Sequence, residues 1–202
     1  MIRLRSERLE IRELPPAAGG KVARFVAENW GFHRQWEPER APDYFTAAVH
    51  RRILRAERIS ESVVHFWLLR HPGTGTGRRW RRAEIVGSAS LSCIVRGAFQ
   101  SCFLGYKTGE KYTRQGYMTE ALRVIVSYAF DELGLHRVEA NIIPRNIASL
   151  ELVRRLGFRE EGLSRRYLKI AGTWEDHVHM TVLSDEWDPT LDGHRRSRDT
   201  VV

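Results

Sequence analysis

Cysteines and long apolar segments are both scarce in this chain, and each absence narrows what the protein can be. Its 202 residues include two cysteines, Cys93 and Cys102, too few for a disulfide framework. No apolar run approaches the ~20 residues that a membrane-spanning helix needs, and residues 1–8 lack the apolar stretch of a signal peptide. We therefore expect a cytoplasmic protein with reduced thiols and no membrane partner.

The sequence also lacks the usual signatures of nucleotide and metal sites. Residues 71–80 are rich in glycine, but they do not end in the Gly-Lys-Ser/Thr of a P-loop, and a basic run follows them in place of a helix. His177 and His179 alternate along one expected strand, a spacing that can bind metal, yet no cysteine or second carboxylate stands at ligand spacing. We predict a flexible loop at 71–80 and no metal site.

Basic residues outnumber acidic ones by 33 to 25, which gives a net charge of +8 and an isoelectric point near 10.0. Arginines gather in four runs, at residues 51–55, 78–82, 165–166 and 195–198. The positive electrostatic potential of such a charge distribution attracts polyanions. Two interpretations stay open: ordinary solvated surface charge, or contact with RNA or with a phosphate-bearing ligand.

Length and hydrophobic periodicity predict one mixed α/β domain, over residues 1–189, followed by a polar, basic tail at 190–202. Apolar stripes at helical spacing predict helices, and strand-like patterns predict strands. The expected helices cover residues 21–30, 44–58, 118–133 and 147–156. The expected strands cover residues 4–14, 62–70, 85–95, 99–106, 136–143, 158–170 and 173–182. This order predicts a partly antiparallel sheet flanked by helices.

A hairpin turned at Gly97 and Ala98 is expected between the strands 85–95 and 99–106. If that turn has two residues, Cys93 and Cys102 lie opposite each other in a non-hydrogen-bonded pair. A disulfide is then geometrically possible, but two reduced core thiols are expected in a reducing compartment.

Residues 111–118, which read Lys-Tyr-Thr-Arg-Gln-Gly-Tyr-Met, form a basic turn before the third expected helix. A helix start offers free backbone N–H groups, and nearby cations make it suited to an anion such as a pyrophosphate. Gly116 has no Cβ to keep the anion away from the backbone. A second strand then leads to Asn146-Ile-Ala-Ser149 and another helix.

These residues resemble the acyl-CoA-binding core of the GNAT N-acetyltransferases, whose motif reads Gln/Arg-x-x-Gly-x-Gly/Ala. The flanking runs at residues 95–99, 104–106, 155–158 and 167–178 are similar to the RimJ/RimL branch, the ribosomal-protein-alanine acetyltransferases. The likeness runs from about residue 4 to residue 189. It implies a single-domain GNAT fold whose central sheet is splayed at the acetyl-CoA site, and transfer of acetyl from acetyl-CoA to an amine by direct attack.

The chain departs from the family pattern at three positions. Thr113 stands where the motif usually has Gln or Arg, and Met118 where it has Gly or Ala. Many members carry a tyrosine seven residues after the asparagine, where this chain has Val153. Backbone N–H groups can still bind the phosphates, but another residue must protonate the departing thiolate.

The resemblance implies a set of cofactor-binding residues on the strand, the basic turn and the second helix start. They are Leu104, Gly105, Tyr106, Lys111, Arg114, Gln115, Gly116, Tyr117, Met118, Thr119 and Asn146. A backbone N–H near Leu104 and Gly105 would polarise the thioester carbonyl. Asn146 has a second interpretation as a helix N-cap.

Ser149 is the candidate acid, because the resemblance places its hydroxyl near the thiol. The general base stays open among Glu37, Glu61, Asp176 and His177, with Glu37 our choice. A free α-amine has a pKa near ~8, so it needs little help at neutral pH.

Trp36, Tyr167 and His177 are candidates to line the acceptor groove; core packing is the alternative. The expected acceptor is the N-terminal α-amine of a ribosomal protein that starts with Ala or Ser, with a ribosome or rRNA contact through the basic runs. Two alternatives remain, a small amine or antibiotic as the acceptor, and a ribosome- or RNA-binding assembly protein. Nothing in the sequence predicts the oligomeric state.

Overall fold

The computed structural model describes residues 1–70 and 82–190, and these residues form one eight-stranded sheet in the order β1-β2-β3-β4-β5-β6-β8-β7. The strands, in chain order, are β1 (Arg3–Arg5), β2 (Leu9–Arg12), β3 (Val63–Arg70), β4 (Glu84–Val95), β5 (Ser101–Thr108), β6 (Arg137–Ile142), β7 (Arg159–Ile170) and β8 (Thr173–Leu183). The helices are α1 (Gly19–His33), α2 (Ala47–Glu57), α3 (Tyr117–Asp131) and α4 (Ile147–Arg155). The predicted loop at 71–80 and nearly all of the predicted tail lie outside the described residues.

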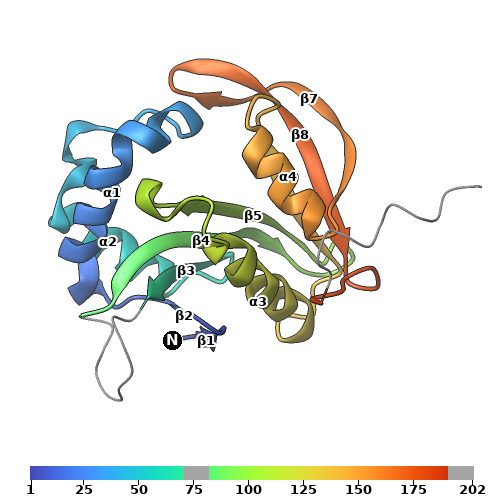
Figure 1. Cartoon of the computed structure of the whole chain (residues 1–202), viewed down its shortest axis with the longest axis horizontal. Coiled ribbons are helices and arrows are strands. Elements are labelled where there is room, and N and C mark those ends of the chain that lie inside the picture. The colour runs from blue at the N-terminus through green and yellow to red at the C-terminus, as the bar shows by residue number, and fades with distance from the viewer. Residues whose placement is uncertain (71–81, 191–202) are drawn as a thin grey trace, which may run out of the picture.

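The mixed architecture expected from the sequence is confirmed, and the sheet is mostly antiparallel. Neighbouring strands pair antiparallel except β5 and β6, which run parallel because α3 carries the chain from one to the other. The sheet therefore has two antiparallel parts, β1–β5 and β6–β8, joined at that one parallel pair (Figure 1).

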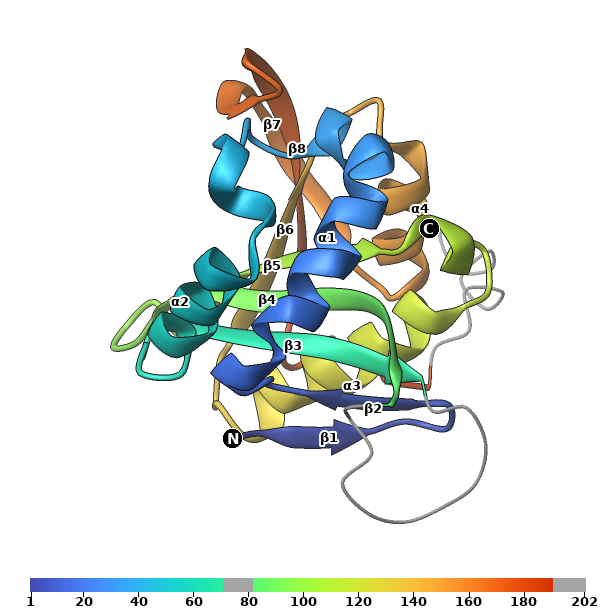
Figure 2. The ribbon, with the colours of Figure 1, turned by 90° about the vertical axis from the view of Figure 1, so that its left-hand side faces the viewer.

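The helices cover opposite faces of the sheet. Buried residues of α3 and α4, such as Ile125 and Leu150, pack with residues of β2 to β6 in the larger core cluster. Val22 and Phe25 of α1 and Leu54 of α2 form a second cluster on the other face. Figure 2 shows α1 and α2 on the near side of β3 and β4.

Local signals in the sequence set the helix boundaries. The Thr46 hydroxyl accepts a hydrogen bond from the Val49 N–H at the start of α2, as expected of a threonine N-cap. Gly134 lies beyond the C-terminal end of α3 with φ of 60°, a conformation that glycine adopts without strain.

The N-terminal expectation of one strand over 4–14 was wrong. The chain instead forms two short antiparallel strands, β1 and β2, with Leu4 opposite Ile11. The Ser6 N–H bonds to the Leu9 carbonyl in the turn between them. The alternation of apolar residues was real, but it could not reveal a turn made without glycine or proline.

The hairpin between β4 and β5 also differs from the two-residue turn considered for Gly97. Val95 pairs with Ser101, and the register shifts between Ser92 and Val95. Cys93 lies in that irregularity with φ of 50° and is exposed, whereas Cys102 is buried. Both are free thiols, and burial raises the pKa of Cys102 to about 12. The two cysteines are therefore not cross-strand partners, and only one of them is in the core.

Candidate active site

The two parts of the sheet separate at the end of a short parallel joint. β5 and β6 pair only at Ser101–Arg137, Cys102–Val138 and Phe103–Glu139. Beyond Phe103, β5 continues to Thr108 with β4 on one side but without β6 on the other. Backbone groups of Leu104 and Gly105 that face β6 are therefore free to bind an extended ligand. The splayed sheet that the resemblance implied is confirmed.

Tyr106 and Ser149 meet beside this opening. The Tyr106 hydroxyl lies 2.6 Å from Ser149 Oγ and 3.2 Å from the Ser149 carbonyl oxygen. Burial raises the pKa of Tyr106, and the hydrogen bond with Ser149 offsets only part of that effect. The phenol is therefore protonated at neutral pH, and it fixes the serine hydroxyl on the α4 side of the opening.

Asn146 starts α4, and its side-chain Oδ1 accepts a hydrogen bond from the Ser149 N–H at 3.2 Å. The prediction that Asn146 is a helix N-cap is therefore confirmed. Its amide nitrogen remains available for a further role.

The basic turn before α3 has the conformation of an anion-binding helix start. Arg114 and Gly116 have φ of 59° and 78°. The N-cap residue, Gly116, has no side chain that could cap the first N–H groups of α3. Lys111, Arg114 and Gln115 are exposed there. Such a turn can present its first N–H groups to a phosphate.

Tyr117 and Met118 can offer only their backbone groups to a ligand at this turn, because their side chains are buried. Their side chains are 7% and 6% exposed and belong to the core cluster. The Thr119 side chain is partly exposed. The usual small residue of the motif is thus replaced by a methionine that packs inward, close to Gly87.

Arg8, from the turn between β1 and β2, packs against the start of α3, and sequence reasoning missed it. Its guanidinium pairs with Glu120 at 2.6 Å, donates to the Gln115 carbonyl at 3.0 Å and lies 4.4 Å from the Tyr117 ring centroid. A Cβ on Gly116 would lie 3.3 Å from Arg8 Nη2. More than a hundred residues separate Arg8 from Glu120, so no local pattern could predict that cation.

Glu37 is held in a network of basic side chains on the other face of the sheet. Its carboxylate lies 2.6 Å from Lys107 Nζ and 3.0 Å from Arg40 Nη2. Burial alone would raise the pKa of Glu37, but Lys107 and Arg40 outweigh burial and hold that pKa below its usual value. A carboxylate with such a low pKa is a weak base and a fixed negative charge.

The loop that carries Trp36 and Glu37 contacts the tip of the β7–β8 hairpin. The Ala171 N–H donates to the Glu37 carbonyl at 3.0 Å, and both views show the hairpin reaching over to the end of α1 (Figures 1 and 2). Arg145 lies 4.9 Å from the Trp36 ring centroid and 2.7 Å from a Glu175 oxygen. We call these contacts the loop–hairpin bridge. The bridge closes one end of the sheet face opposite α3.

Tyr167 of β7 and His177 of β8 lie together on the hairpin. Their ring centroids are 5.6 Å apart, and Tyr167 is 5.1 Å from His179. His177 is buried, burial lowers its pKa, and its Nδ1 lies 3.1 Å from the Glu175 carbonyl oxygen. A buried, neutral His177 is a poor candidate for a base that must reach a substrate.

The other base candidates occupy structural or peripheral positions. Asp176 Oδ1 accepts the N–H of Arg166, which has φ of 51° where the β7–β8 register shifts. Glu61 is exposed just before β3. Within the described ranges, no group of three or more His, Cys, Asp or Glu residues could hold a metal ion. In the same ranges, no helix is long and apolar enough to cross a membrane.

The mixed sheet separates between β5 and β6, and the start of α3 beside this opening has the geometry of an anion-binding site. This combination is typical of GNAT acyltransferases. A family model described as the acetyltransferase (GNAT) domain matches residues 8–159. The chain belongs to this family. It is an N-acetyltransferase and takes acetyl-CoA as its co-substrate, as the sequence resemblance implied.

Several relatives match this chain over nearly their whole length. The probable N-acetyltransferase YjcK of Bacillus subtilis is 35% identical over 185 residues, 91% of this chain and 98% of that protein. The ribosomal protein uS5-alanine N-acetyltransferase of Escherichia coli is 33% identical over 190 residues, 93% of this chain and 94% of that protein. The ribosomal-protein-S5-alanine acetyltransferase of Vibrio fischeri superposes with a TM-score of 0.81 at 27% identity, over 94% of this chain and 100% of that one.

The structure of Mycobacterium smegmatis RimJ in complex with CoA-disulfide has a TM-score of 0.80 to this chain at 25% identity, over 92% of this chain and 87% of that one. The resemblance to the RimJ branch is therefore confirmed over most of the chain.

Proposed function

We propose that this enzyme acetylates the N-terminal α-amine of a protein, and that its substrate is a ribosomal protein that begins with Ala or Ser. The observation that carries this proposal is the 33% identity over 190 residues to an enzyme named for the N-terminal alanine of a ribosomal protein. The loop–hairpin bridge supports it, because a sheet face that is closed at one end suits a chain terminus better than a continuous segment.

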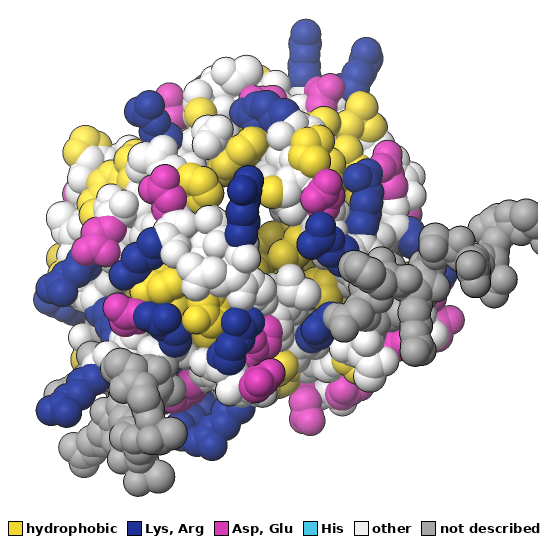
Figure 3. All heavy atoms as spheres, viewed as in Figure 1, with side chains coloured by type: hydrophobic (Ala, Val, Ile, Leu, Met, Phe, Trp, Pro, Cys, Tyr) yellow, Lys and Arg dark blue, Asp and Glu magenta, His cyan; other side chains and the backbone are white. Residues whose placement is uncertain are grey.

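Acetyl-CoA is held, in this proposal, by two sets of groups on the α3 and α4 face of the sheet. N–H groups of residues 116–119 and the cations Arg8, Lys111 and Arg114 bind the pyrophosphate. Leu104, Gly105 and the Asn146 amide bond to the pantetheine arm in the opening. The apolar side chains visible at the floor of a central hollow in Figure 3 are consistent with that arm.

The amine attacks the thioester carbonyl directly, and the developing oxyanion is stabilised by a backbone N–H near Leu104 and Gly105. Ser149 Oγ gives a proton to the departing thiolate. Tyr106 holds that hydroxyl in place at 2.6 Å. Positioning of the two reactants supplies much of the acceleration.

Glu37, in this proposal, attracts the protonated α-amine as a fixed negative charge next to Trp36. Its low pKa keeps it ionised at neutral pH. It serves as an electrostatic guide and passes on a proton only through water. Tyr167 lines the acceptor groove in this proposal, and the buried His177 only packs against the Tyr167 ring.

The experiment is acetyl transfer to a panel of synthetic peptides and small amines, followed by mass spectrometry. Peptides beginning with Ala or Ser should be acetylated on the α-amine, and the same peptides with a blocked N-terminus should not react. Spermidine and aminoglycoside acceptors should react poorly. Robust spermidine acetylation with no reaction at any N-terminal peptide would overturn the proposal.

We also propose a ribosome or rRNA contact through the basic side chains. On the face drawn in Figure 3, Lys and Arg side chains are spread among Asp and Glu side chains. Retention on ribosomes that decreases as salt rises, with unchanged acetyl transfer to a free peptide, is the expected result. Retention that does not depend on salt would rule out an electrostatic contact.

A further inference from the structure

Asn141 of β6 has a buried carbonyl oxygen that lacks a hydrogen bond. Within residues 1–70 and 82–190, which the structure describes, no donor reaches Asn141 Oδ1. A buried acceptor without a partner lowers the stability of the fold. Such a group therefore calls for an explanation, and a role in binding or catalysis is one.

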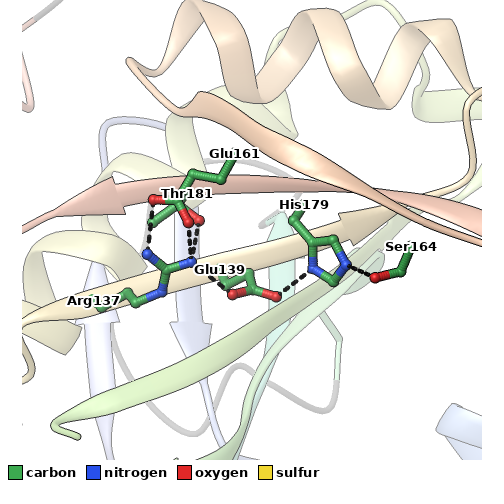
Figure 4. A network of polar contacts seen from close by, with 6 residues as sticks. All are labelled: Arg137, Glu139, Glu161, Ser164, His179 and Thr181. Atoms are coloured by element: carbon green, nitrogen blue, oxygen red, sulfur yellow. Dashed lines mark hydrogen bonds and ion pairs between the residues drawn. The ribbon is translucent and has the colours of Figure 1, made fainter. Parts of the chain in front are cut away.

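The polar neighbours of Asn141 are bonded to one another and leave this oxygen out. His179 of β8 pairs directly with Asn141 in the sheet. The His179 Nδ1 lies 2.8 Å from Glu139 Oε1, and its Nε2 lies 2.7 Å from Ser164 Oγ (Figure 4). Glu139 Oε2 lies 2.9 Å from Arg137 Nη2. These contacts fasten β6, β8 and β7 together, on the side of β6 away from β5, and Asn141 takes no part in them.

Asn141 lies on the strand that borders the opening, at the level where β5 and β6 have just parted. The last pair of the parallel joint is Phe103–Glu139, and two residues further along the two strands are Gly105 and Asn141. Successive residues of a strand project to alternate faces. Ala140 projects into the core under α3 and α4, so Asn141 projects to the opposite face. Across the opening, Gly105 has no side chain that could cover Asn141.

The face that carries the Asn141 side chain is the one from which, in the proposed function, the acceptor approaches. Glu37 and the loop–hairpin bridge lie on this face, whereas acetyl-CoA is bound from the α3 and α4 face. The two reactants therefore meet at the opening. Asn141 is the first residue of β6 beyond the joint whose side chain projects to the acceptor side.

The amide of Asn141 is suited to a neutral amine. Part of this side chain is exposed, and the terminal torsion of an asparagine amide is broad, so Oδ1 can turn toward a donor in the opening. An amide oxygen accepts an N–H but carries no formal charge. Unlike a carboxylate, it does not favour the ammonium form, which has no lone pair with which to attack the thioester.

We propose that Asn141 Oδ1 accepts a hydrogen bond from the attacking amine, and that this bond makes the enzyme select primary α-amines over secondary ones. The inference rests on the proposed function, since it needs an amine that approaches the opening from this face. It adds a substrate-binding residue to the acceptor side and leaves Glu37 its electrostatic role.

The hydrogens of the amine explain this selection. A neutral primary amine has a lone pair and two N–H groups. The lone pair forms the bond to the acetyl carbon, and the C–S bond breaks with its electron pair on sulfur, which takes the proton of Ser149 Oγ. One amine proton passes to solvent water, and water returns a proton to Ser149. The second N–H stays in the amide product and keeps its bond to Asn141, whereas a secondary amine has one N–H and the reaction removes it.

The test measures kcat/KM in the full-length protein for two matched acceptors, an Ala-starting peptide and the same peptide with N-methylalanine in the first position. Asn141→Leu replaces an unsatisfied amide by an apolar group of similar size, which the fold should tolerate, and Asn141→Ala is a second variant. Gln100→Met is the matched control. Gln100 Oε1 is also buried without a partner in the described residues, but Gln100 lies at the joined end of β5 and β6. Calorimetry of acetyl-CoA binding checks that each variant is folded.

We expect either Asn141 variant to lower kcat/KM for the Ala-starting peptide by about tenfold, as for the loss of one hydrogen bond between neutral groups, with unchanged acetyl-CoA affinity. For the N-methyl peptide the same variants should change kcat/KM by less than about twofold, because the bond they remove is not made there. Gln100→Met should change neither value. A merely structural role of Asn141 would lower both values alike and leave the preference for the primary amine unchanged.

The possible outcomes separate the two proposals. A wild-type enzyme that acetylates peptides while both Asn141 variants keep its preference for the primary amine overturns the role of Asn141 and leaves the proposed function intact. A wild-type enzyme that acetylates only small amines overturns the proposed function, and the same variants then test Asn141 on a small primary amine and its N-methyl derivative. Absence of transfer to every amine overturns both.

Discussion

At the scale of single residues, we expect Gly116 to decide whether the helix start of α3 can bind phosphate. Its φ of 78° suits glycine, and its missing Cβ leaves Arg8 Nη2 and the first N–H groups open to one ligand. In the proposal, three cations (Arg8, Lys111 and Arg114) and this glycine bind the same anion, although Arg8 comes from the turn between β1 and β2 and not from the motif.

The first prediction is that Gly116→Val weakens acetyl-CoA binding by about 10²-fold, equivalent to the loss of one or two hydrogen bonds to a charged group. Titration calorimetry measures this. Gly97→Val is the matched control, because Gly97 also has positive φ, 71°, but its Cβ would meet nothing within 4 Å. Equal affinity in a folded Gly116→Val variant would show that phosphate binds elsewhere.

The second prediction concerns Ser149. Ser149→Ala should lower kcat by roughly 10²-fold and leave acetyl-CoA affinity nearly unchanged, because the hydroxyl acts on the leaving group. Tyr106→Phe should cause a smaller loss, since it removes only the group that positions Ser149 at 2.6 Å. Steady-state kinetics with one acceptor peptide measures both. An unchanged kcat in Ser149→Ala would mean that the thiolate leaves without this acid.

Residues whose role depends on neighbours in sequence could be predicted, and those that depend on distant contacts could not. Gly116 and the Asn146 cap follow from local backbone geometry, and the family motif marks them. Arg8 and His179 carry no local mark, because each acquires its partners only when the sheet forms. His179 looked like half of an improbable metal pair, and only the fold shows Glu139 and Ser164 on either side of it.

At the scale of elements, the loop–hairpin bridge links three segments distant in sequence. Arg145 connects them through the Gln35 carbonyl at 3.3 Å, Glu175 at 2.7 Å and the Trp36 ring at 4.9 Å. Periodicity predicted the hairpin itself and most strand positions to within a few residues. It could not predict this bridge, since side chains of irregular segments make it.

The third prediction is that Arg145→Met raises KM for an acceptor peptide several-fold and lowers the free energy of unfolding by about 1 kcal/mol or less, as for an exposed ion pair with a cation–π contact. Peptide kinetics and urea unfolding measure the two effects. Arg154→Met removes the exposed ion pair between Arg154 of α4 and Glu160 of β7 and is the control. An equal rise of KM in both variants would contradict a role for the bridge.

At the scale of the whole molecule, buried histidines make the free energy of unfolding depend on pH. This dependence falls at pH values above those at which carboxylates titrate. Burial lowers the pKa of His33, His50 and His177 from the ordinary 6.5. Each is neutral when folded, and the unfolded chain gains protons there as pH falls below about 6.5. The stability that these histidines contribute is present above that pH and lost below it.

The fourth prediction is that the free energy of unfolding in urea falls steadily from pH 7 to pH 5 and more steeply below pH 4.5. The second decline comes from Glu37 and Glu139, whose pKa values lie below the ordinary 4.5, so their contribution is lost as pH falls through the folded values. His33→Gln keeps a donor for the Thr108 carbonyl, 2.8 Å away, and should flatten the slope between pH 7 and 5. A flat wild-type profile there would contradict the prediction.

The three-residue joint between β5 and β6 has a consequence for cooperativity. Five strands and three strands share few backbone bonds and are joined otherwise by the larger core cluster, so we expect their amide hydrogens to exchange at different rates when no ligand joins them. A co-substrate bound in the opening replaces the missing ladder and adds its binding free energy, about 2.7 kcal/mol at a hundredfold excess over Kd, to the unfolding of both parts. Saturating acetyl-CoA should therefore slow exchange in β8 as much as in β4, and make the molecule unfold as one unit.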